Sequence, residues 1–435
     1  MDAVSIPGQI SPDPLRVAIC LPELHLLQKV MKGETADATF IIQGYIADGL
    51  KSRGHNLKFL GPYDSEESIY SGELSNLEPA RRTWTKNTLF QFASKAIWRI
   101  QRSVGIPYLN IFSNLRLMDA CLQGLSDCDL VYERNGMYKF GVAMACKRLG
   151  IPYVLYVEAD DILEHDIMRR PLTGLLRQQA ARAFRYNLRA ADRIICVSEP
   201  LKVHLVNKWE MPADKIVVFP NVADVRRFCP DPDAREMVRA SFDIGNAPLI
   251  IFVGSFYEWH DVTTLLKAFV RVLNVDPDAR LMLVGDGAKR QATMQLAIEL
   301  GITRAVIFTG MVAHTDVPRF MAAADIAVVP YPVLQQDVWL SPLKLFEYMA
   351  AGNAIIASNV GQLSEWVANE RNGLLVPPGD ISALAAGIER LIGDPGLRME
   401  LGQNARVEAV QKHSWDRYLS DLEDVYYSVI KDGKS

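Results

Sequence analysis

Short apolar runs alternate with longer amphipathic segments along most of the chain. The runs are apolar throughout, which is typical of strands that are buried on both faces of a parallel sheet. In the first half they are RVAICL (16–21), NLKFLG (56–61), DLVYE (129–133), PYVLYVE (152–158), RIICVS (193–198) and KIVVFP (215–220). In the second half they are PLIIFVG (248–254), RLMLVG (280–285), AVIFTG (305–310), DIAVVP (325–330) and AIIAS (354–358). Alternation of strands and helices predicts an α/β fold with parallel sheets.

The two series of runs fit two doubly wound domains better than one large sheet. A chain of 435 residues is also too long for a single hydrophobic core. The segment FPNVADVRRFCPDPDAREM interrupts both periodicities with three prolines and several charges, so we expect the join near residue 222. The predicted domains are therefore 1–222 and 223–410.

Composition argues against a nucleic-acid-binding, a disulfide-linked secreted or a membrane-spanning protein. The 47 basic and 51 acidic residues give a formal charge of -4, which offers no indication of a nucleic-acid partner. The six cysteines are scattered without a CxxC pair, which predicts reduced thiols. The N-terminus lacks the pattern of a secretory signal, and no apolar stretch approaches the roughly 20 residues needed to cross a bilayer. We therefore expect a cytoplasmic protein.

The stretch SPLKLFEYMAAG (341–352) carries the first candidate chemistry. Ser341 and Pro342 favour a helix start, with the serine hydroxyl as cap, and Gly352 favours a helix end. Taken alone, the stretch predicts a surface helix whose Lys344 and Glu347 face water. Its position after the strand at 325–330 favours a ligand site instead, because open parallel sheets bind ligands beyond the carboxyl ends of their strands.

The start of this helix suits a phosphate group. Free amides at Leu343 and Lys344, together with the positive end of the helix, attract an anion, and Lys344 adds a full charge. Glu347 lies one turn further along, where its carboxylate is placed to accept hydrogen bonds from the hydroxyls of a ribose. The segment thus predicts a site for a nucleoside diphosphate. The GDG turn at 285–287 is either a further ligand contact or only a turn.

Several segments resemble one known family. The run SPLKLFEYMAAGNAIIASNVGQLSEWVANERNGLLVPPGD is similar to the signature region of the family-four glycosyltransferases. Six further segments agree in the same order, and the resemblance covers nearly the whole chain: LKSRGHNLKFL, RIICVSEPLKVHL, VVFPNVADVRRFCPD, IIFVGSFYEWHDVTTLLKAF, ARLMLVGDG and NARVEAVQKHSWDRYL.

This resemblance implies a fold and an activity. The fold is GT-B, in which two Rossmann-like domains face a cleft and the C-terminal helix, here within 411–435, crosses back onto the first domain. The activity is transfer of a sugar, with retention of configuration, from a nucleoside diphosphate sugar to the hydroxyl of a glycan, lipid-linked or small-molecule acceptor. The resemblance implies no cofactor and no essential metal.

Site residues follow from the same resemblance. Glu347 matches the carboxylate on the nucleotide ribose, and Leu343 and Lys344 match the contacts to the diphosphate. Val312 lies where the base meets the backbone. Glu365 lies at a commonly acidic position, for which a structural role at a helix start is an equal alternative.

The sequence also departs from the family pattern. A glutamate is expected at position 339, where this chain has Trp339. An arginine and a lysine are expected after Gly254, at positions that hold Ser255 and His260. The form GSFYEWHD resembles a bacterial subgroup, which implies that His260 contacts a phosphate or the donor sugar.

Residues of the first half complete the candidate site. Glu133 and Arg134 end a strand that faces the cleft, and Arg134 is predicted either to contact donor or acceptor or to form an ion pair at a loop. The acidic residues of YVEADD (156–161) end the next strand. Gly33 lies in the loop after the first strand, where the family carries a pair of glycines close to the diphosphate.

The DCD triplet at 127–129 resembles the metal-binding acidic pair of another glycosyltransferase fold. It precedes a strand and so lies at the end of the sheet away from the cleft, and we therefore expect no essential metal. Basic, aromatic-containing stretches at 81–102 and 168–189 predict either peripheral contact with an anionic membrane or packing on their own domain.

Two alternatives to a transferase remain open from the sequence. Trp339 and Ser255 are compatible with a binding or regulatory protein that kept the fold without catalysis. Another GT-B enzyme, such as a nucleotide-sugar epimerase, is the second alternative.

Overall fold

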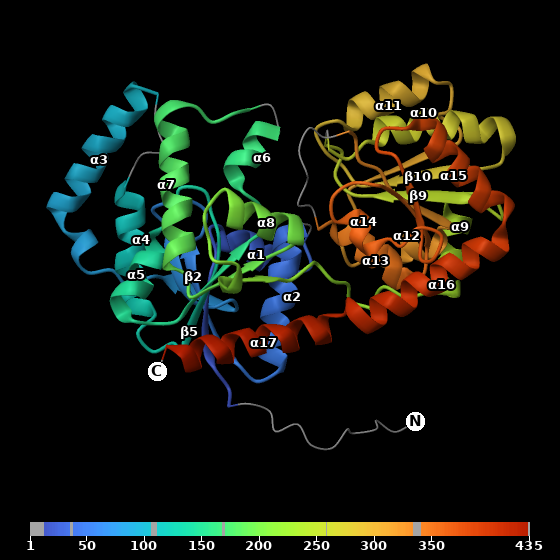
Figure 1. Ribbon diagram of the computed structural model, residues 1–435. Coiled ribbons are helices and arrows are strands. Elements are labelled where there is room, and N and C mark those ends of the chain that lie inside the picture. Colours follow the sequence, from blue (N-terminus) through green and yellow to red (C-terminus); the bar gives the residue numbers. More distant parts are fainter. Residues whose placement is uncertain are drawn as a thin grey trace.

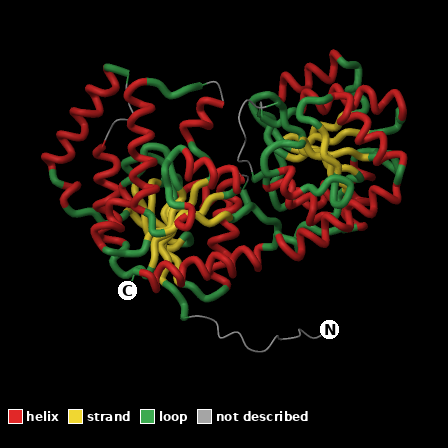
Figure 2. The backbone as a smooth tube through the Cα atoms, in the orientation of Figure 1, coloured by secondary structure: helices red, strands yellow, loops and turns green. Residues whose placement is uncertain are grey.

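The computed structural model describes residues 13–34, 38–105, 111–167, 170–257, 259–333 and 341–433. The chain forms two α/β bodies, each with a central sheet surrounded by helices (Figure 1). Figure 2 shows the strands in two separate groups, one in each body. Trp339 lies outside the described residues.

The first body contains an eight-stranded sheet with the order β4-β3-β2-β1-β5-β6-β7-β8. All six strands predicted for this half are present and parallel to one another. The antiparallel strands β3 and β4 were not predicted from the sequence. The strands are β1 (Arg16–Cys20), β2 (Asn56–Pro62), β3 (Ile69–Glu73), β4 (Asn76–Pro79), β5 (Leu130–Arg134), β6 (Tyr153–Val157), β7 (Arg193–Cys196) and β8 (Ile216–Val218).

The second body contains a six-stranded parallel sheet with the order β11-β10-β9-β12-β13-β14. This is the strand order of a doubly wound fold, and the direction of winding reverses between β9 and β12. The short β14 is the one strand of this sheet that the apolar runs did not predict. The strands are β9 (Leu249–Val253), β10 (Arg280–Val284), β11 (Val306–Gly310), β12 (Ile326–Val329), β13 (Ala354–Ser358) and β14 (Leu374–Val376).

Helices cover both faces of each sheet, and most of them connect consecutive strands. Those of the first body are α1 (Leu24–Met31), α2 (Ala38–Ser52), α3 (Thr88–Ser103), α4 (Ile111–Gly124), α5 (Gly141–Leu149), α6 (Asp161–Ile167), α7 (Gly174–Ala190) and α8 (Glu199–Asn207), with the 3-10 turns η1 (Trp84–Lys86) and η3 (Ala213–Lys215). Those that follow are α9 (Pro232–Ser241), α10 (Val262–Val275), α11 (Arg290–Glu299), α12 (Val317–Ala323), α13 (Leu343–Ala351), α14 (Leu363–Trp366), α15 (Ile381–Gly393), α16 (Pro395–Lys412) and α17 (Trp415–Asp432).

The C-terminal helix α17 returns to the first body, as predicted. Figure 1 shows it running beneath that body, with the chain end close to β5. Leu419 packs so closely on α2 that a Cβ at Gly49 would lie 2.2 Å from it. Glu423 accepts hydrogen bonds from Arg53 at 2.6 Å and from His55 at 2.8 Å. These contacts confirm the crossing that the GT-B resemblance implies.

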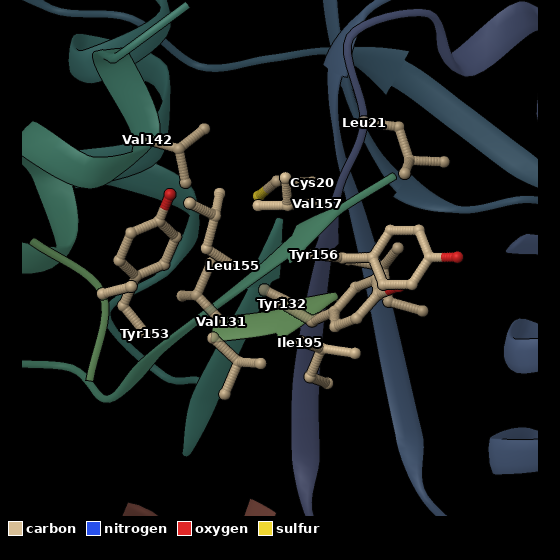
Figure 3. Packing of buried hydrophobic residues seen from close by; sticks show 14 of the residues in the cluster. Cys20, Leu21, Val131, Tyr132, Val142, Tyr153, Leu155, Tyr156, Val157 and Ile195 are labelled. Carbon is tan, nitrogen blue, oxygen red and sulfur yellow. The ribbon is translucent and has the colours of Figure 1, made fainter. Parts of the chain in front are cut away.

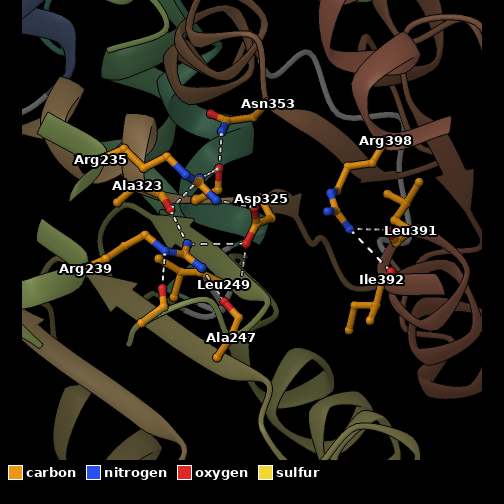
Figure 4. A network of polar contacts seen from close by, with 12 residues as sticks. Arg235, Arg239, Ala247, Leu249, Ala323, Asp325, Asn353, Leu391, Ile392 and Arg398 are labelled. Carbon is orange, nitrogen blue, oxygen red and sulfur yellow. Dashed lines mark hydrogen bonds and ion pairs between the residues drawn. The ribbon is translucent and has the colours of Figure 1, made fainter. Parts of the chain in front are cut away.

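Each sheet buries side chains on both of its faces. Figure 3 shows the core of the first body, where Tyr132 and Tyr156 lie on neighbouring strands with their ring centroids 5.9 Å apart. In the second body, Asp325 ties the amino end of the sheet together: it accepts hydrogen bonds from the Leu249 amide and from Arg235 and Arg239 of α9 (Figure 4). The opposite, carboxyl end carries the loops described next.

Candidate functional site

Helix α13 is buried along its whole length. Lys344 is 8% exposed and Glu347 4%, and the seven other residues of the helix are buried as well. The Tyr348 hydroxyl accepts a hydrogen bond of 2.6 Å from the Val253 amide, which joins the helix to the end of β9. The interpretation of 341–352 as a surface helix is therefore wrong, because a helix that is apolar all round packs inside a protein.

The start of α13 carries no side-chain cap. The predicted cap, Ser341, instead accepts a hydrogen bond of 2.9 Å from the backbone amide of Asn221. Pro342 occupies the N-cap position and offers no side-chain acceptor. The prediction that Ser341 caps the helix is wrong, because a residue 120 positions away competes for its hydroxyl. The uncapped first turn leaves backbone amides without a side-chain acceptor, which suits an anionic ligand.

The Lys344 ammonium group is buried, and none of the described residues forms an ion pair with it. Its Nζ lies 4.4 Å from the centroid of the Phe252 ring, and no atom of the described chain accepts a hydrogen bond from it. Burial lowers the pKa of Lys344 to about 7, although Glu347 acts in the opposite direction. A buried cation without hydrogen bonds is costly, so this group favours an anionic ligand.

Glycines bring the loops after β9 and β10 close to this ammonium group. A Cβ at Gly254, where φ is +147°, would lie 2.5 Å from Lys344 Nζ. A Cβ at Gly285 would lie 2.1 Å from the Gly254 carbonyl oxygen, and one at Gly287 would lie 2.6 Å from the Phe256 amide nitrogen. The two glycines of the GDG turn thus serve the packing of neighbouring loops, which favours the structural alternative for that turn.

His260 is held in one tautomer beside the same loop. Its Nδ1 lies 2.6 Å from the Ser255 carbonyl oxygen, so Nδ1 carries the proton and donates it. Burial, with the nearby charge of Lys344, lowers the pKa of His260 to about 3. The neutral ring therefore offers an acceptor at Nε2, which suits a sugar hydroxyl better than a phosphate.

Glu347 has a hydrogen-bond partner that the sequence did not indicate. His314, in the loop after β11, lies with Nε2 2.7 Å from Glu347 Oε1, and it must donate because a carboxylate only accepts. Val312 lies in the same loop and packs partly buried against the core of the second body. The loop after β11 and helix α13 therefore meet where a nucleoside would lie if its diphosphate occupied the helix start.

Two family models match the chain. The model described as "Glycosyltransferase Family 4" matches residues 44–227, and that described as "Glycosyl transferases group 1" matches residues 247–394. The chain belongs to the family-four, group 1 glycosyltransferases. This confirms the family to which the sequence motifs pointed.

Curated relatives of this family 4 member match part of their length. An uncharacterized glycosyltransferase of Methanocaldococcus jannaschii is 28% identical over 54% of this chain and 59% of its own. The GDP-mannose-dependent alpha-(1-6)-phosphatidylinositol monomannoside mannosyltransferase of Mycolicibacterium smegmatis is 25% identical over 47% of this chain and 54% of its own. The chain thus spans somewhat more than half the length of these two relatives.

Solved structures of other proteins share the fold of this glycosyltransferase. HepE of Anabaena, in complex with UDP-glucose, superposes with a TM-score of 0.67 at 19% identity and covers 95% of this chain and all of its own. Sucrose-phosphate synthase of Thermosynechococcus elongatus gives a TM-score of 0.66 at 18% identity, covering 96% of this chain and 100% of its own. These likenesses confirm the GT-B fold.

In the first body of the family 4 chain, Arg134 forms an ion pair. Its Nε lies 3.0 Å and its terminal nitrogen 2.9 Å from Glu158 Oε2, and the guanidinium lies 5.7 Å from the Phe40 ring centroid. Glu133 points to the other face of the sheet, where the Tyr153 hydroxyl donates to it at 2.5 Å. Burial raises the pKa of Glu133 to about 8. Glu133 therefore lies on the opposite face of the sheet from Arg134.

The remaining predicted site residues are Gly33 and Glu365. Gly33 does not directly follow β1, because helix α1 intervenes; it is exposed, with a φ of +78° just beyond the end of that helix. Glu365 is exposed on α14, where burial and the charge of Glu199 raise its pKa. Among the described residues, no hydrogen bond or ion pair joins Arg134, Gly33 or Glu365 to Lys344.

The DCD triplet is engaged in ion pairs at the amino end of β5. Asp129 pairs with Arg16 at 2.7 Å, and Asp127 pairs with Lys58 at 3.2 Å. Over the ranges that the structure describes, no group of three or more His, Cys, Asp or Glu residues is placed to hold a metal ion. The absence of an essential metal stays a prediction.

Proposed function

We propose that the protein transfers a sugar, with retention, from a nucleoside diphosphate sugar to an acceptor hydroxyl. In this proposal the bond between the sugar carbon and the diphosphate breaks, and the acceptor oxygen bonds the same carbon on the same face. The acceptor proton passes to an oxygen of the leaving diphosphate. No side-chain nucleophile is needed for this reaction.

The observation that carries the proposal is the buried, unpaired Lys344 at the uncapped start of α13. Its ammonium group and the amides of the first turn are placed to stabilise charge that develops on the leaving diphosphate. Fixed donors of this kind are effective because they do not reorganise during the reaction. Glu347 binds the ribose, with His314 holding its carboxylate, and His260 accepts a hydrogen bond from the sugar.

The names of relatives limit the choice of nucleotide in the donor but do not identify it. Two mycobacterial-type relatives are named for GDP-mannose, whereas the Anabaena neighbour was solved with UDP-glucose. We therefore propose a UDP- or GDP-sugar as donor. A thermal-shift screen of nucleoside diphosphates identifies the base, because a bound ligand stabilises the native state by mass action.

Other parts of the assignment are also proposals. We propose a division of the chain near residue 222, with 1–222 on the acceptor side and 223–410 on the donor side. We further propose a cytoplasmic protein in peripheral contact with the membrane. None of the helices that the structure describes is long and apolar enough to cross a bilayer.

Glu347→Ala tests the nucleotide site. We expect the wild-type protein to bind UDP or GDP at least about tenfold more tightly than the 2′,3′-dideoxy analogue, because each hydrogen bond to a charged group contributes roughly 1.5–3 kcal/mol. The variant is expected to bind both forms equally by calorimetry. Glu299→Ala, on the exposed side of α11, is the control. A variant that keeps the full preference for the ribose hydroxyls would rule out this role for Glu347.

Product analysis tests the reaction itself. A transferase releases nucleoside diphosphate in proportion to the acceptor added, and the anomeric configuration of the product reports retention. Binding of nucleotide sugar without any release would instead favour a regulatory protein. Conversion of the sugar without an acceptor would favour an epimerase.

A further inference from the structure

Helix α3 leaves an apolar stripe uncovered. Leu89, Phe92, Ile100 and Val104 are 75%, 73%, 60% and 66% exposed. With Ala96 they recur at intervals of three or four residues, which places them on one face of the helix. Figure 1 shows α3 at the outer edge of the first body, away from the second. We call these five positions the apolar stripe.

The opposite face of α3 is firmly attached to the body. The Phe90 ring packs edge-on against Trp84 and Phe112, with centroids 5.4 Å and 5.0 Å away. Ser94 accepts a hydrogen bond of 2.7 Å from the buried Arg116. Since the inner face already packs, the apolar stripe is not a core surface displaced from its own domain.

The sequence around α3 carries charges of one sign. Between Glu78 and Asp119 the sequence holds seven lysines and arginines and no acidic residue, although the whole chain has a net charge of -4. Lys95, Arg99 and Arg102 are on α3 itself, and their helical positions place them along one border of the apolar stripe. We call these three residues the basic flank.

The other basic stretch singled out in the sequence is built differently. In α7 the apolar residues Ala180, Ala183, Phe184 and Leu188 are buried, so this helix packs on its own body. Arg177 of α7 is paired with Asp166 at 2.7 Å. The two stretches look alike in sequence but differ in structure. Of the two helices, only α3 presents an apolar face to solvent.

We propose that α3 docks flat on an anionic lipid bilayer, with the apolar stripe entering the acyl boundary and the basic flank meeting lipid phosphates. An exposed apolar face bordered by cations is the arrangement that binds the membrane interface. A second copy of the chain fits less well, because it would bring another basic flank against the first. Presentation of a lipid-linked acceptor on this membrane is a consequence that rests on the proposed function, whereas docking does not.

Flotation of the full chain with lipid vesicles tests the proposal, without any nucleotide. Vesicles of phosphatidylcholine with phosphatidylserine are compared with pure phosphatidylcholine, at low and high salt. We expect binding to the anionic vesicles alone, weakened by salt because the Debye length shortens. Equal binding to both kinds of vesicle, or binding to neither, would overturn the proposal.

Matched variants assign the binding to α3. We expect Arg99→Glu/Arg102→Glu to lower vesicle affinity about tenfold or more, since each basic residue near an anionic surface contributes about fivefold. Phe92→Asp/Ile100→Asp should abolish binding. The controls Lys267→Glu/Arg304→Glu and Val275→Asp/Ile298→Asp change exposed positions of the second body and should bind as the wild type does.

Two further measurements keep the result unambiguous. The thermal unfolding midpoint of each variant shows whether it is folded, and a nucleotide-induced shift shows whether the donor site is intact. Failure of docking with an intact nucleotide shift would reject this inference alone. Sedimentation velocity without lipid addresses a protein partner: a dimer that Phe92→Asp/Ile100→Asp dissociates would assign the apolar stripe to self-association instead.

Discussion

Arg134 and Lys344 are cations at the carboxyl ends of their sheets, the first half-buried and the second buried, and their surroundings differ. Arg134 follows β5 and makes two contacts to Glu158, at 3.0 Å and 2.9 Å. Lys344 is the second residue of α13 and has no hydrogen-bond acceptor within the described ranges. The first body therefore pairs its own cation, whereas no described residue pairs with that of the second, and an anionic ligand is proposed to do so.

The pKa values of the two groups show the same contrast. Burial lowers the pKa of Arg134, but the carboxylates of Glu158 and Asp161 raise it more, so its net pKa is above the ordinary value. Burial lowers the pKa of Lys344 to about 7, and Glu347 offsets this only in part. The contrast teaches that a binding site can be recognised by a polar group whose burial the protein does not compensate.

The largest effect is expected from Lys344→Met. Loss of the ammonium group should lower turnover of a nucleotide sugar by about 10²–10³-fold, as for removal of one preorganised donor. The unliganded variant should unfold at higher temperature, because replacing a buried charge by an apolar side chain of similar size stabilises by about 1 kcal/mol or more. Kinetics and thermal unfolding check the two parts.

The control for this variant is Lys267→Met on the exposed side of α10, which should change neither quantity. A Lys344→Met protein that is less stable than the wild type would mean that the charge has a counter-ion in the native state. The contrast with Arg134 would then fail.

A smaller effect is expected from pH. With a folded pKa of about 7, Lys344 is largely neutral at pH 8, and a bound diphosphate should restore its charge. Binding of a nucleoside diphosphate at pH 8 should therefore take up roughly one proton, and its Kd should weaken up to about tenfold per pH unit above 7. Calorimetry in buffers of different ionisation enthalpy measures the uptake.

The same linkage fixes how stability depends on pH. The unfolded lysine, with a pKa near 10.4, binds more protons than the folded one between pH 7 and 10, so stability of the unliganded protein should rise over that range. Lys344→Arg, which stays charged, should show neither proton uptake nor this rise. Uptake that persists in Lys344→Arg would trace the proton to another group.

The contrast also shows what sequence can and cannot predict. Apolar runs predicted the parallel strands because burial on both faces leaves a pattern in the chain itself. The proximity of Lys344 and Glu347 was predictable because one helix carries both. The hydrogen bond between His314 and Glu347 was not predictable, because 33 residues separate them and nothing in their local sequence sets that contact.

Adjacent residues of a strand point to opposite faces, so the sequence alone already places Glu133 and Arg134 on opposite sides of the sheet. The error about the cap could not have been avoided. The hydroxyl of Ser341 accepts a hydrogen bond from the amide of Asn221, 120 positions away, and no local rule predicts that contact. Trp339, which stands where the family pattern has a glutamate, lies outside the described residues.

The smallest effect on the nucleotide is expected from Arg134→Gln. Because Glu158 already binds this guanidinium, its removal should change the Kd of a nucleoside diphosphate by no more than about twofold. Stability should fall by about 1–3 kcal/mol, since Glu158 loses its partner in a half-buried position. Arg134→Gln/Glu158→Gln should recover part of that loss, which denaturant unfolding measures. A tenfold loss of nucleotide affinity in Arg134→Gln would show that the first body also binds the diphosphate. Arg134 and Lys344 would then both contact the ligand.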